Sequence, residues 1–210
     1  MRSDEAGNVF AGIWALCGSK GEKKMLGTPF SQFVKAQASV VYSHAVMDSH
    51  KLVGRMLIGA AHAYGNSSQV PYSEQFYIGG ANSIRAFAVR SVGPGSYLPA
   101  ADNTNGYYDQ TGTFKLEMNL EYRFPLFSYL KGAVFLDAGN IWLLKDDENR
   151  PGAKLQFADM WRQMAVGSGI GLRFDMDMLV IRGDLGYALH APYATGNRGY
   201  FNMPNFKKSL

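Results

Sequence analysis

The feature that most constrains the fold of this chain is a strict alternation of apolar and polar side chains over residues 114–124. A period of two over this length predicts a β-strand with one wholly apolar face. The opposite face carries four charges and one amide, which a soluble sandwich would have to leave in water. A barrel in lipid instead turns its apolar face to the acyl chains and its polar face to the lumen. The apolar set is Phe114, Leu116, Met118, Leu120, Tyr122 and Phe124, and the polar set is Lys115, Glu117, Asn119, Glu121 and Arg123.

Comparable patterns elsewhere in the chain predict further strands. They lie at residues 8–16, 34–43, 52–60, 132–142, 164–175 and 179–190. About seven strands are therefore expected. Several of them reach the roughly 9–11 residues that a tilted strand needs to cross a bilayer, whereas strands of globular proteins average about 5–6 residues. Strand length thus favours a membrane barrel over a sandwich.

The connections between these strands alternate between long and short. The long ones are residues 18–32, 65–110 and 143–160, and the short ones are residues 47–50, 125–129 and 176–177. Outer-membrane barrels have short periplasmic turns and long outer loops. The predicted fold is therefore all-β, an antiparallel transmembrane β-barrel of which this chain supplies a part.

Aromatic residues lie where a barrel has its interfacial girdles. Phe124, Phe127 and Tyr129 are next to a short turn, and Trp142 and Trp161 flank one long loop. Trp and Tyr are enriched at the two membrane–water interfaces. The alternative is that they are ordinary core or loop aromatics; strand length and loop alternation favour the girdle.

Composition limits the chemistry that the chain can carry. A single cysteine, Cys17, permits neither a disulfide within the chain nor a multi-cysteine metal site. The four histidines lack metal-ligand spacing, and the GSGIG at residues 167–171 lies inside a predicted strand instead of opening a helix. Basic residues are interleaved with acidic ones, which argues against a nucleic-acid partner. We expect no enzyme activity, no catalytic residue, no metal and no cofactor.

Residues 74–95 read EQFYIGGANSIRAFAVRSVGPG. This segment resembles the sixth-loop motif of the C-terminal barrel of the outer-membrane assembly superfamily, which includes the BamA and TamA insertases and the bacterial surface-antigen proteins. Ile84, Arg85 and Phe87 match the motif, and Ala86 stands where the family has glycine. Three further family motifs follow in order, NLEYRFP, VFLDAGNIW and GSGIGLRFD. The resemblance covers nearly the whole chain after about residue 33 and is greatest to the Bacteroidetes type.

The resemblance implies that residues 1–210 are the C-terminal part of an outer-membrane barrel. The N-terminal half of the barrel, the periplasmic modules and the final strand would then lie outside the chain. The implied function is to help outer-membrane proteins insert and fold, or to translocate clients. The implied partners are the lipid bilayer, client outer-membrane proteins and, as an option, accessory lipoproteins or periplasmic modules. In the family this work is attributed to a weak seam between the first and last strands, so the isolated chain is expected to lack insertase activity.

Arg85 lies on a predicted loop, residues 65–110, that is long enough to need a structural reason. Glu121 occupies the polar face of its strand, and Asp137 has the parity of Phe135 in the next strand. If the loop folds back into the lumen, Arg85 can contact both carboxylates, as the loop arginine of the family does, in paired hydrogen bonds. A glycine stripe would give the loop room: Gly167, Gly169 and Gly171. The alternative is a solvated Arg85 and an Asp137 in a turn-like Asp-Ala-Gly-Asn.

Two other functions remain compatible with the sequence. One is a passive pore or a secretion translocator built on the same barrel. The other is a soluble β-rich binding module whose charged face is simply hydrated. The position of the apolar faces, exposed or packed against one another, separates the second of these from a barrel.

Overall fold

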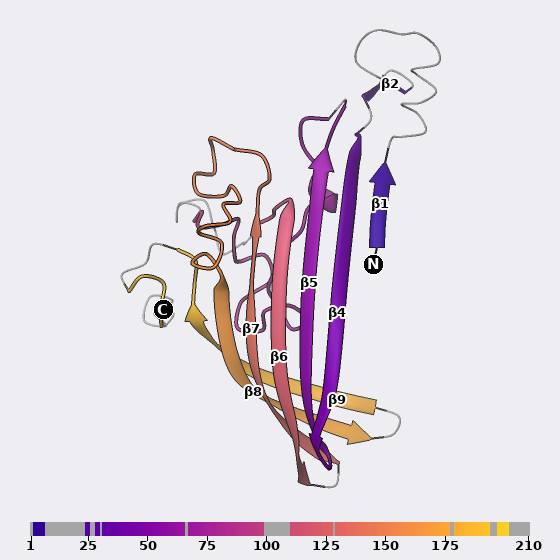
Figure 1. Cartoon of the computed structure of the whole chain (residues 1–210), viewed down its shortest axis with the longest axis vertical. Helices are drawn as coiled ribbons and strands as arrows, with labels where there is room; N and C mark the ends of the chain where they lie inside the picture. The colour runs from indigo at the N-terminus through magenta and orange to yellow at the C-terminus, as the bar shows by residue number, and fades with distance from the viewer. Residues whose placement is uncertain are drawn as a thin grey trace, which may run out of the picture.

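The computed structural model describes residues 2–6, 24–25, 28–29, 31–65, 67–98, 110–127, 129–176, 179–193 and 197–201. Within these residues the chain forms an open, antiparallel, seven-stranded sheet in the order β1-β4-β5-β6-β7-β8-β9 (Figure 1). Its strands are β1 (Arg2–Ala6), β4 (Phe33–Met47), β5 (His50–Ala63), β6 (Phe114–Phe127), β7 (Leu130–Trp142), β8 (Ala165–Met176) and β9 (Leu179–His190). Outside the sheet lie a two-stranded ribbon, β2 (Lys24–Met25) and β3 (Thr28–Pro29), and one 3-10 turn, η1 (Tyr72–Glu74).

The all-β, antiparallel prediction is confirmed, and six of the predicted strands correspond to β4–β9. The predicted strand at residues 8–16 lies outside the described residues. The turn predicted at residues 125–129 is shorter than expected, because β6 continues through Pro125 to Phe127. The pairing register shifts between Pro125 and Phe127, at a place where proline has no N–H to donate to the ladder.

We call the end of the sheet at which β4 connects to β5 and β6 connects to β7 the turn end, and the opposite end the loop end. Figure 1 shows that β8 and β9 swing away from the direction of β4–β6 and cross the sheet near the turn end. The sheet is therefore strongly curled, as the right-handed twist of successive strands requires in a barrel wall. We call its concave side the inner face and its convex side the outer face.

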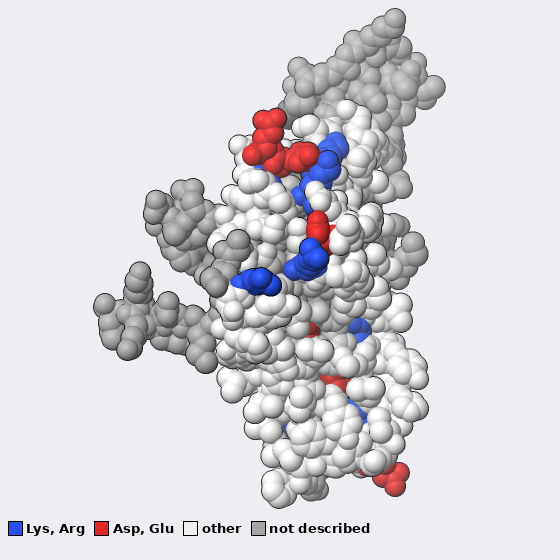
Figure 2. Space-filling view, turned by 60° about the vertical axis from the view of Figure 1, so that its left-hand side comes forward, with Lys and Arg blue, Asp and Glu red and all other residues white. Residues whose placement is uncertain are grey.

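Cross-strand register sorts the side chains onto these two faces. Arg55 pairs with Asn119, Asn119 with Asp137, and Asp137 with Gly167, so one row of the inner face runs through four strands. Val40, Ile170 and Leu185 have the opposite parity and are 61–73% exposed. In the view of Figure 2, charged side chains gather toward the loop end and are sparse over the rest of the surface. The apolar faces are thus exposed, as in a barrel wall, and not packed into a sandwich.

Among the described residues, no helix is both long and apolar enough to cross a membrane.

The larger apolar core lies on the inner face at the loop end. It is formed where the described residues of the segment 64–113, which we call the lumen loop, pack onto β4, β5, β7 and β8. Apolar side chains of the loop meet inward-facing residues of the strands, so burying the loop removes both sets from water. The members are Phe33, Ala61, Ala63, Val70, Phe76, Ile78, Ile84, Val92, Ile141 and Ala165, with Phe87 packed against them.

A second apolar cluster lies on the outer face at the loop end. Residues 143–164, which we call the outer-wall loop, fold back over Leu116 and Trp142. Trp142 is fully buried, so the expectation that it lies in an interfacial girdle is wrong, because the loop that follows it covers its ring. Trp161, at the far end of the same loop, is 63% exposed.

The lipid-facing assignment of the outer face can be tested with one charge. Leu136 lies near the middle of β7 on the outer face and is exposed. We expect Leu136→Arg to lower the free energy of unfolding by about 2–4 kcal/mol, the cost of an arginine near the bilayer midplane. Denaturant titration of the full-length protein refolded in phospholipid vesicles measures this loss.

The matched control is Asn149→Arg, which adds the same charge at an exposed position of the outer-wall loop. It should change the free energy of unfolding by no more than about 0.5 kcal/mol. Equal losses in the two variants would contradict a lipid-facing position for Leu136.

Candidate functional site

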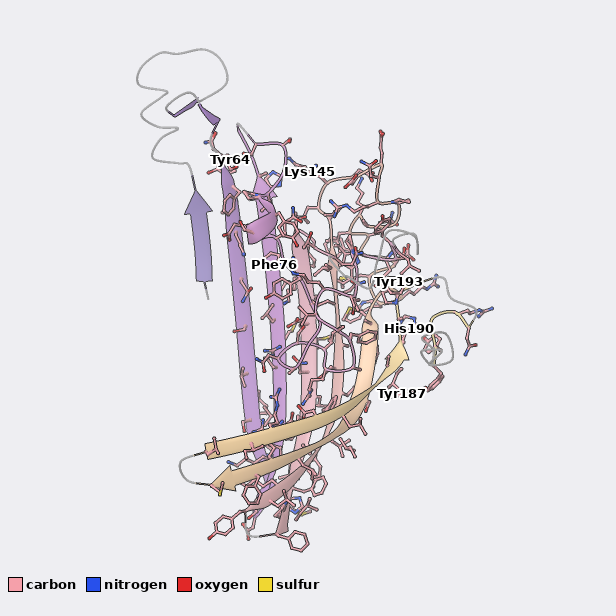
Figure 3. The ribbon with its side chains drawn as sticks, turned by 180° about the vertical axis from the view of Figure 1, so that it is seen from behind. Tyr64, Phe76, Lys145, Tyr187, His190 and Tyr193 are labelled. Atoms are coloured by element: carbon pink, nitrogen blue, oxygen red, sulfur yellow. The ribbon has the colours of Figure 1, made fainter. Side chains whose placement is uncertain are left out.

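The lumen loop crosses the inner face and places its tip in the middle of the sheet. Figure 3, which views the inner face, shows the loop lying across β5, β6 and β7 above the crossing of β8 and β9. Phe76 pairs with Gly112 in an antiparallel bridge, and Arg90 N–H donates to the Ile78 carbonyl at 2.8 Å. Gly79 has a φ of +102°, a conformation that glycine adopts without the steric cost of a Cβ. These contacts close the base of the loop. We call residues 80–87, beyond this base, the tip.

Arg85, at this tip, makes two parallel hydrogen bonds to Asp137 of β7. Its Nε lies 2.8 Å from Asp137 Oδ2 and its Nη2 lies 2.8 Å from Oδ1, while its backbone N–H donates to Oδ2 at 3.1 Å. Its Nη1 donates to Glu121 Oε2 of β6 at 2.6 Å. The guanidinium carbon lies 3.6 Å from the centre of the Phe135 ring. The structure therefore brings together Arg85, Glu121 and Asp137, the residues that the sequence singled out.

This arginine is almost removed from solvent, since its side chain is 7% exposed and that of Asp137 is fully buried. Burial lowers the pKa of the Arg85 guanidinium, but the hydrogen bonds with Asp137 and Glu121 outweigh this effect and raise the pKa above its usual value. The group therefore stays charged. A charge-assisted, bidentate pair in a site of low dielectric is the arrangement in which an ion pair is least screened.

Further donors complete the hydrogen bonding of the two carboxylates. Asn119 Nδ2 donates to Asp137 Oδ1 at 2.8 Å. Glu121 Oε1 accepts from Arg123 Nε at 2.6 Å and from Arg173 Nη2 at 2.5 Å. Sequence reasoning did not assign these three residues, although each has the parity of the inner face, which was the available signal.

A second group of contacts fixes the start of the tip. Arg55 Nη2 donates to the Asn82 carbonyl at 2.8 Å and lies 3.1 Å from Glu117 Oε2. Ser83 Oγ hydrogen-bonds the other oxygen of Glu117. Three strands, β5, β6 and β7, therefore hold the tip through side chains of both signs.

Asp184 of β9, which pairs with Gly171 of β8, is a further carboxylate of the inner face that the sequence analysis did not assign to the site. Its Oδ2 lies 3.8 Å from Arg85 Nη1 and 3.0 Å from Arg182 Nε. Neither oxygen makes a hydrogen bond with good geometry, although both are buried. Its charge is balanced by these two arginines, which extends the ion-pair cluster to the last strand of the sheet.

The other motif residues pack around the arginine. Ile84 is fully buried in the core of the inner face, and Phe87 packs against the same cluster. Ala86, which replaces the family glycine, is not among the residues with positive φ. It therefore carries its Cβ without backbone strain.

The predicted glycine stripe of β8 divides into different roles. A Cβ on Gly167 would overlap Ala86 of the tip, so this glycine does make room for the loop. A Cβ on Gly169 would instead lie 2.6 Å from the Phe135 ring, and one on Gly171 would collide with the Asp184 carboxylate. At these two positions the nearest atoms belong to β7 and β9, so the space is filled by Phe135, on whose ring the Arg85 guanidinium lies, and by Asp184. That Gly169 and Gly171 also make room for the loop stays a prediction. The second glycine against the tip is Gly186 of β9, which sequence reasoning missed.

A double-mutant cycle tests the coupling of Arg85 to Asp137. Arg85→Ala and Asp137→Ala should each lower the free energy of unfolding by about 3–5 kcal/mol, because each leaves a buried charge without its partner. The double variant should lose little more than the worse single variant. The more exposed pair of Arg150 and Asp147 in the outer-wall loop is the control, with an expected coupling below about 1 kcal/mol. Losses at Arg85 and Asp137 that simply add would contradict the contact.

The approach of the tip to β9 gives a prediction with an internal control. A Cβ on Gly186 would lie 2.9 Å from the Ala86 Cα, whereas one on Gly183 of the same strand would meet nothing within 4 Å. Gly186→Ala should therefore lower the free energy of unfolding by about 1–3 kcal/mol. Gly183→Ala should leave it unchanged or slightly raised. If the two variants unfold alike in denaturant titrations, the tip does not rest on β9.

Comparison with known proteins identifies the family. The profile of the Omp85 superfamily domain matches residues 20–204. The outer membrane protein assembly factor BamA of Neisseria meningitidis serogroup B is 29% identical over 90 residues, which are 40% of this chain and 11% of that protein.

Two solved structures are similar. BamA from Haemophilus ducreyi lacking POTRA domains 1–3 matches with a TM-score of 0.57 and 18% identity, over 76% of this chain and 32% of that chain. CdiB from Acinetobacter baumannii matches with a TM-score of 0.46 and 19% identity, over 77% of this chain and 24% of that chain. The chain therefore spans about a third or less of the length of these relatives. The Bacteroidetes type stays a prediction.

Omp85 proteins are outer-membrane barrels, and their profile covers the inward ion-pair cluster, the lumen loop and the lipid-facing strands alike. This chain belongs to the Omp85 superfamily and lies in the bacterial outer membrane.

Proposed function

We propose that this chain is the C-terminal part of the barrel of an assembly factor that helps other outer-membrane proteins insert and fold. The observation that carries the proposal is the Arg85 tip, fixed on the inner face by Asp137 and Glu121. The name of the Neisseria relative, an outer membrane protein assembly factor, supports the same function. The activity needs no catalytic residue and no cofactor, because inserting a strand is a change of packing and pairing and not of covalent bonds.

In this proposal the tip fixes the curvature of the wall. Backbone hydrogen bonds link each strand only to its neighbours, whereas Arg85 links the loop to β6 and β7 directly and lies against Asp184 of β9. The cluster therefore holds strands at a set curl even where the sheet edges part. A client strand can then pair with an open edge while the rest of the wall keeps its shape. Clients and the bilayer are the proposed partners, with accessory lipoproteins or periplasmic modules as further ones.

The second candidate is a secretion translocator or a pore of the same barrel type. A cavity of about 500 Å³ lies between the lumen loop and β4 to β6, and Lys35, Gln37, Arg55 and Glu117 line it. A space of this size, with both charged and apolar side chains in its lining, is the feature that would admit an extended chain. The apolar core that the lumen loop forms with the strands at the loop end weighs against an open passive pore, because it fills the inner face there.

Reconstitution separates the two functions. The full-length protein in liposomes should speed the folding of an unfolded client barrel, measured as the appearance of protease-resistant client. Arg85→Ala should lower that rate by about tenfold, since an interaction of a few kcal/mol that fixes the wall is lost. The control is Arg150→Ala, whose ion pair lies in the outer-wall loop.

Conductance of the same proteoliposomes in planar bilayers gives the second readout. A wild-type protein that conducts but does not speed client folding would support the translocator or pore. Client folding at the wild-type rate by Arg85→Ala would contradict a role for the tip in assembly.

A further inference from the structure

The outer face of the sheet has a cap at the loop end that the assembly function does not use. Leu155, Met160 and Met164 of the outer-wall loop pack on Leu116 and Trp142. Trp142 Nε1 donates to Gln163 Oε1 at 2.7 Å. The loop therefore lies on the outside of the wall and does not project away from it.

A second segment, residues 190–201, lies beside this loop at the end of β9. His190 pairs with Val166 after a register shift, and its Nδ1 donates to the Met164 carbonyl at 2.6 Å (Figure 3). Tyr200 folds back against the His190 ring at a centroid distance of 4.6 Å, and Phe201 N–H donates to the Leu189 carbonyl at 3.0 Å. The described part of this segment is thus held against the end of β9, and His190 joins it to Met164 of the outer-wall loop.

The height of the cap corresponds to the outer edge of the membrane. Leu116, under the cap, is about 11 residues along β6 from Phe127 at the turn end. At about 3.3 Å per residue and a tilt of about 40°, this spans roughly 28 Å, close to the ~25 Å apolar band of an outer-membrane barrel. Since short turns are periplasmic, the cap lies at the outer leaflet.

Between the two segments, and lined also by Ser96 of the lumen loop, is a cavity of about 300 Å³ with a basic lining. Arg162, Arg198 and His190 line it, with Asp159 as the one carboxylate among its described lining residues. Arg162 is 88% exposed and lies 3.9 Å from Asp159, too far for a hydrogen bond. Arg198 is exposed and forms no ion pair within the described part of the chain. The two guanidinium groups are therefore available to an anion.

Exposed aromatic side chains lie on the same two segments that contribute Arg162 and Arg198 to this cavity. Phe157 and Trp161 belong to the outer-wall loop, and Tyr200 and Phe201 belong to the segment after β9. All four are at least half exposed. Large aromatic rings at this height are typical of the headgroup level, where one side of the ring contacts acyl chains. A soluble anion would leave these rings in water, whereas a lipid would cover them.

We propose that the cap is a binding site for the phosphorylated headgroup of an outer-leaflet lipid. Arg162 and Arg198 donate hydrogen bonds to the phosphate oxygens, for which the planar guanidinium is well suited. Phe157, Trp161, Tyr200 and Phe201 contact the upper acyl chains and the glycerol or sugar of the same lipid. The proposal rests on the position of the chain in the outer membrane and not on its assembly function.

The experiment compares lipid retention by the full-length protein in nanodiscs. The discs contain phosphatidylcholine with one-tenth of a fluorescent lipid that bears a phosphomonoester headgroup. We expect this lipid to be enriched beside Trp161, seen as energy transfer from tryptophan, and the enrichment to fall about tenfold or more in the double variant Arg162→Gln with Arg198→Gln. Each such charge contributes roughly fivefold to the attraction of an anionic membrane surface.

The matched control removes two charges from the same loop outside the cavity, Arg150→Gln with Lys154→Gln, and should keep the enrichment. Inorganic phosphate at millimolar concentration should not displace the lipid. Equal loss in the two double variants would overturn the site in favour of a general charge effect. Displacement by inorganic phosphate would overturn the lipid as its ligand in favour of a soluble anion.

Discussion

The structure depends on one constraint: the outer face of a strand in a membrane barrel contacts lipid and not water. Its apolar side chains face the acyl chains, so the charged ones must be satisfied within the barrel. Glu117, Glu121, Asp137 and Asp184 all point to the inner face, and each lies within ion-pair distance of an arginine. An arginine supplied by a loop at the centre of these acids resolves the problem and at the same time fixes the loop.

The lumen loop is consequently a structural core and not a surface excursion. Its part at the loop end buries apolar residues against β4, β5, β7 and β8. Its tip joins the ion-pair cluster nearer the turn end. The apolar contacts and the ion pairs of the loop act differently. Apolar burial is non-directional and holds the loop against the wall, whereas the paired hydrogen bonds of Arg85 define where the tip lies and how it is oriented. Because the lumen loop occupies the inner face, the open sheet keeps its curl.

Residue parity predicted much of this arrangement. Alternation placed Glu121 on the polar face of its strand and gave Asp137 the parity of Phe135, and the family motif indicated Arg85. It could not separate Gly167, which borders the tip, from Gly169 and Gly171, which make room for Phe135 and Asp184. All three have the same parity. Only the height of a residue along the neighbouring strands decides which side chain fills the space above it.

The sequence by itself determined the strands, their apolar faces and the residue types of the site, because period-two patterning and turn spacing are local properties. Tertiary structure alone decided that Gly186 contacts the tip, that Trp142 is buried under the outer-wall loop, and that Arg162 and Arg198 share one cavity. The physical reason is that curl and loop packing bring together residues far apart in the chain. Their contacts depend on the shape of the whole sheet and not on any local pattern.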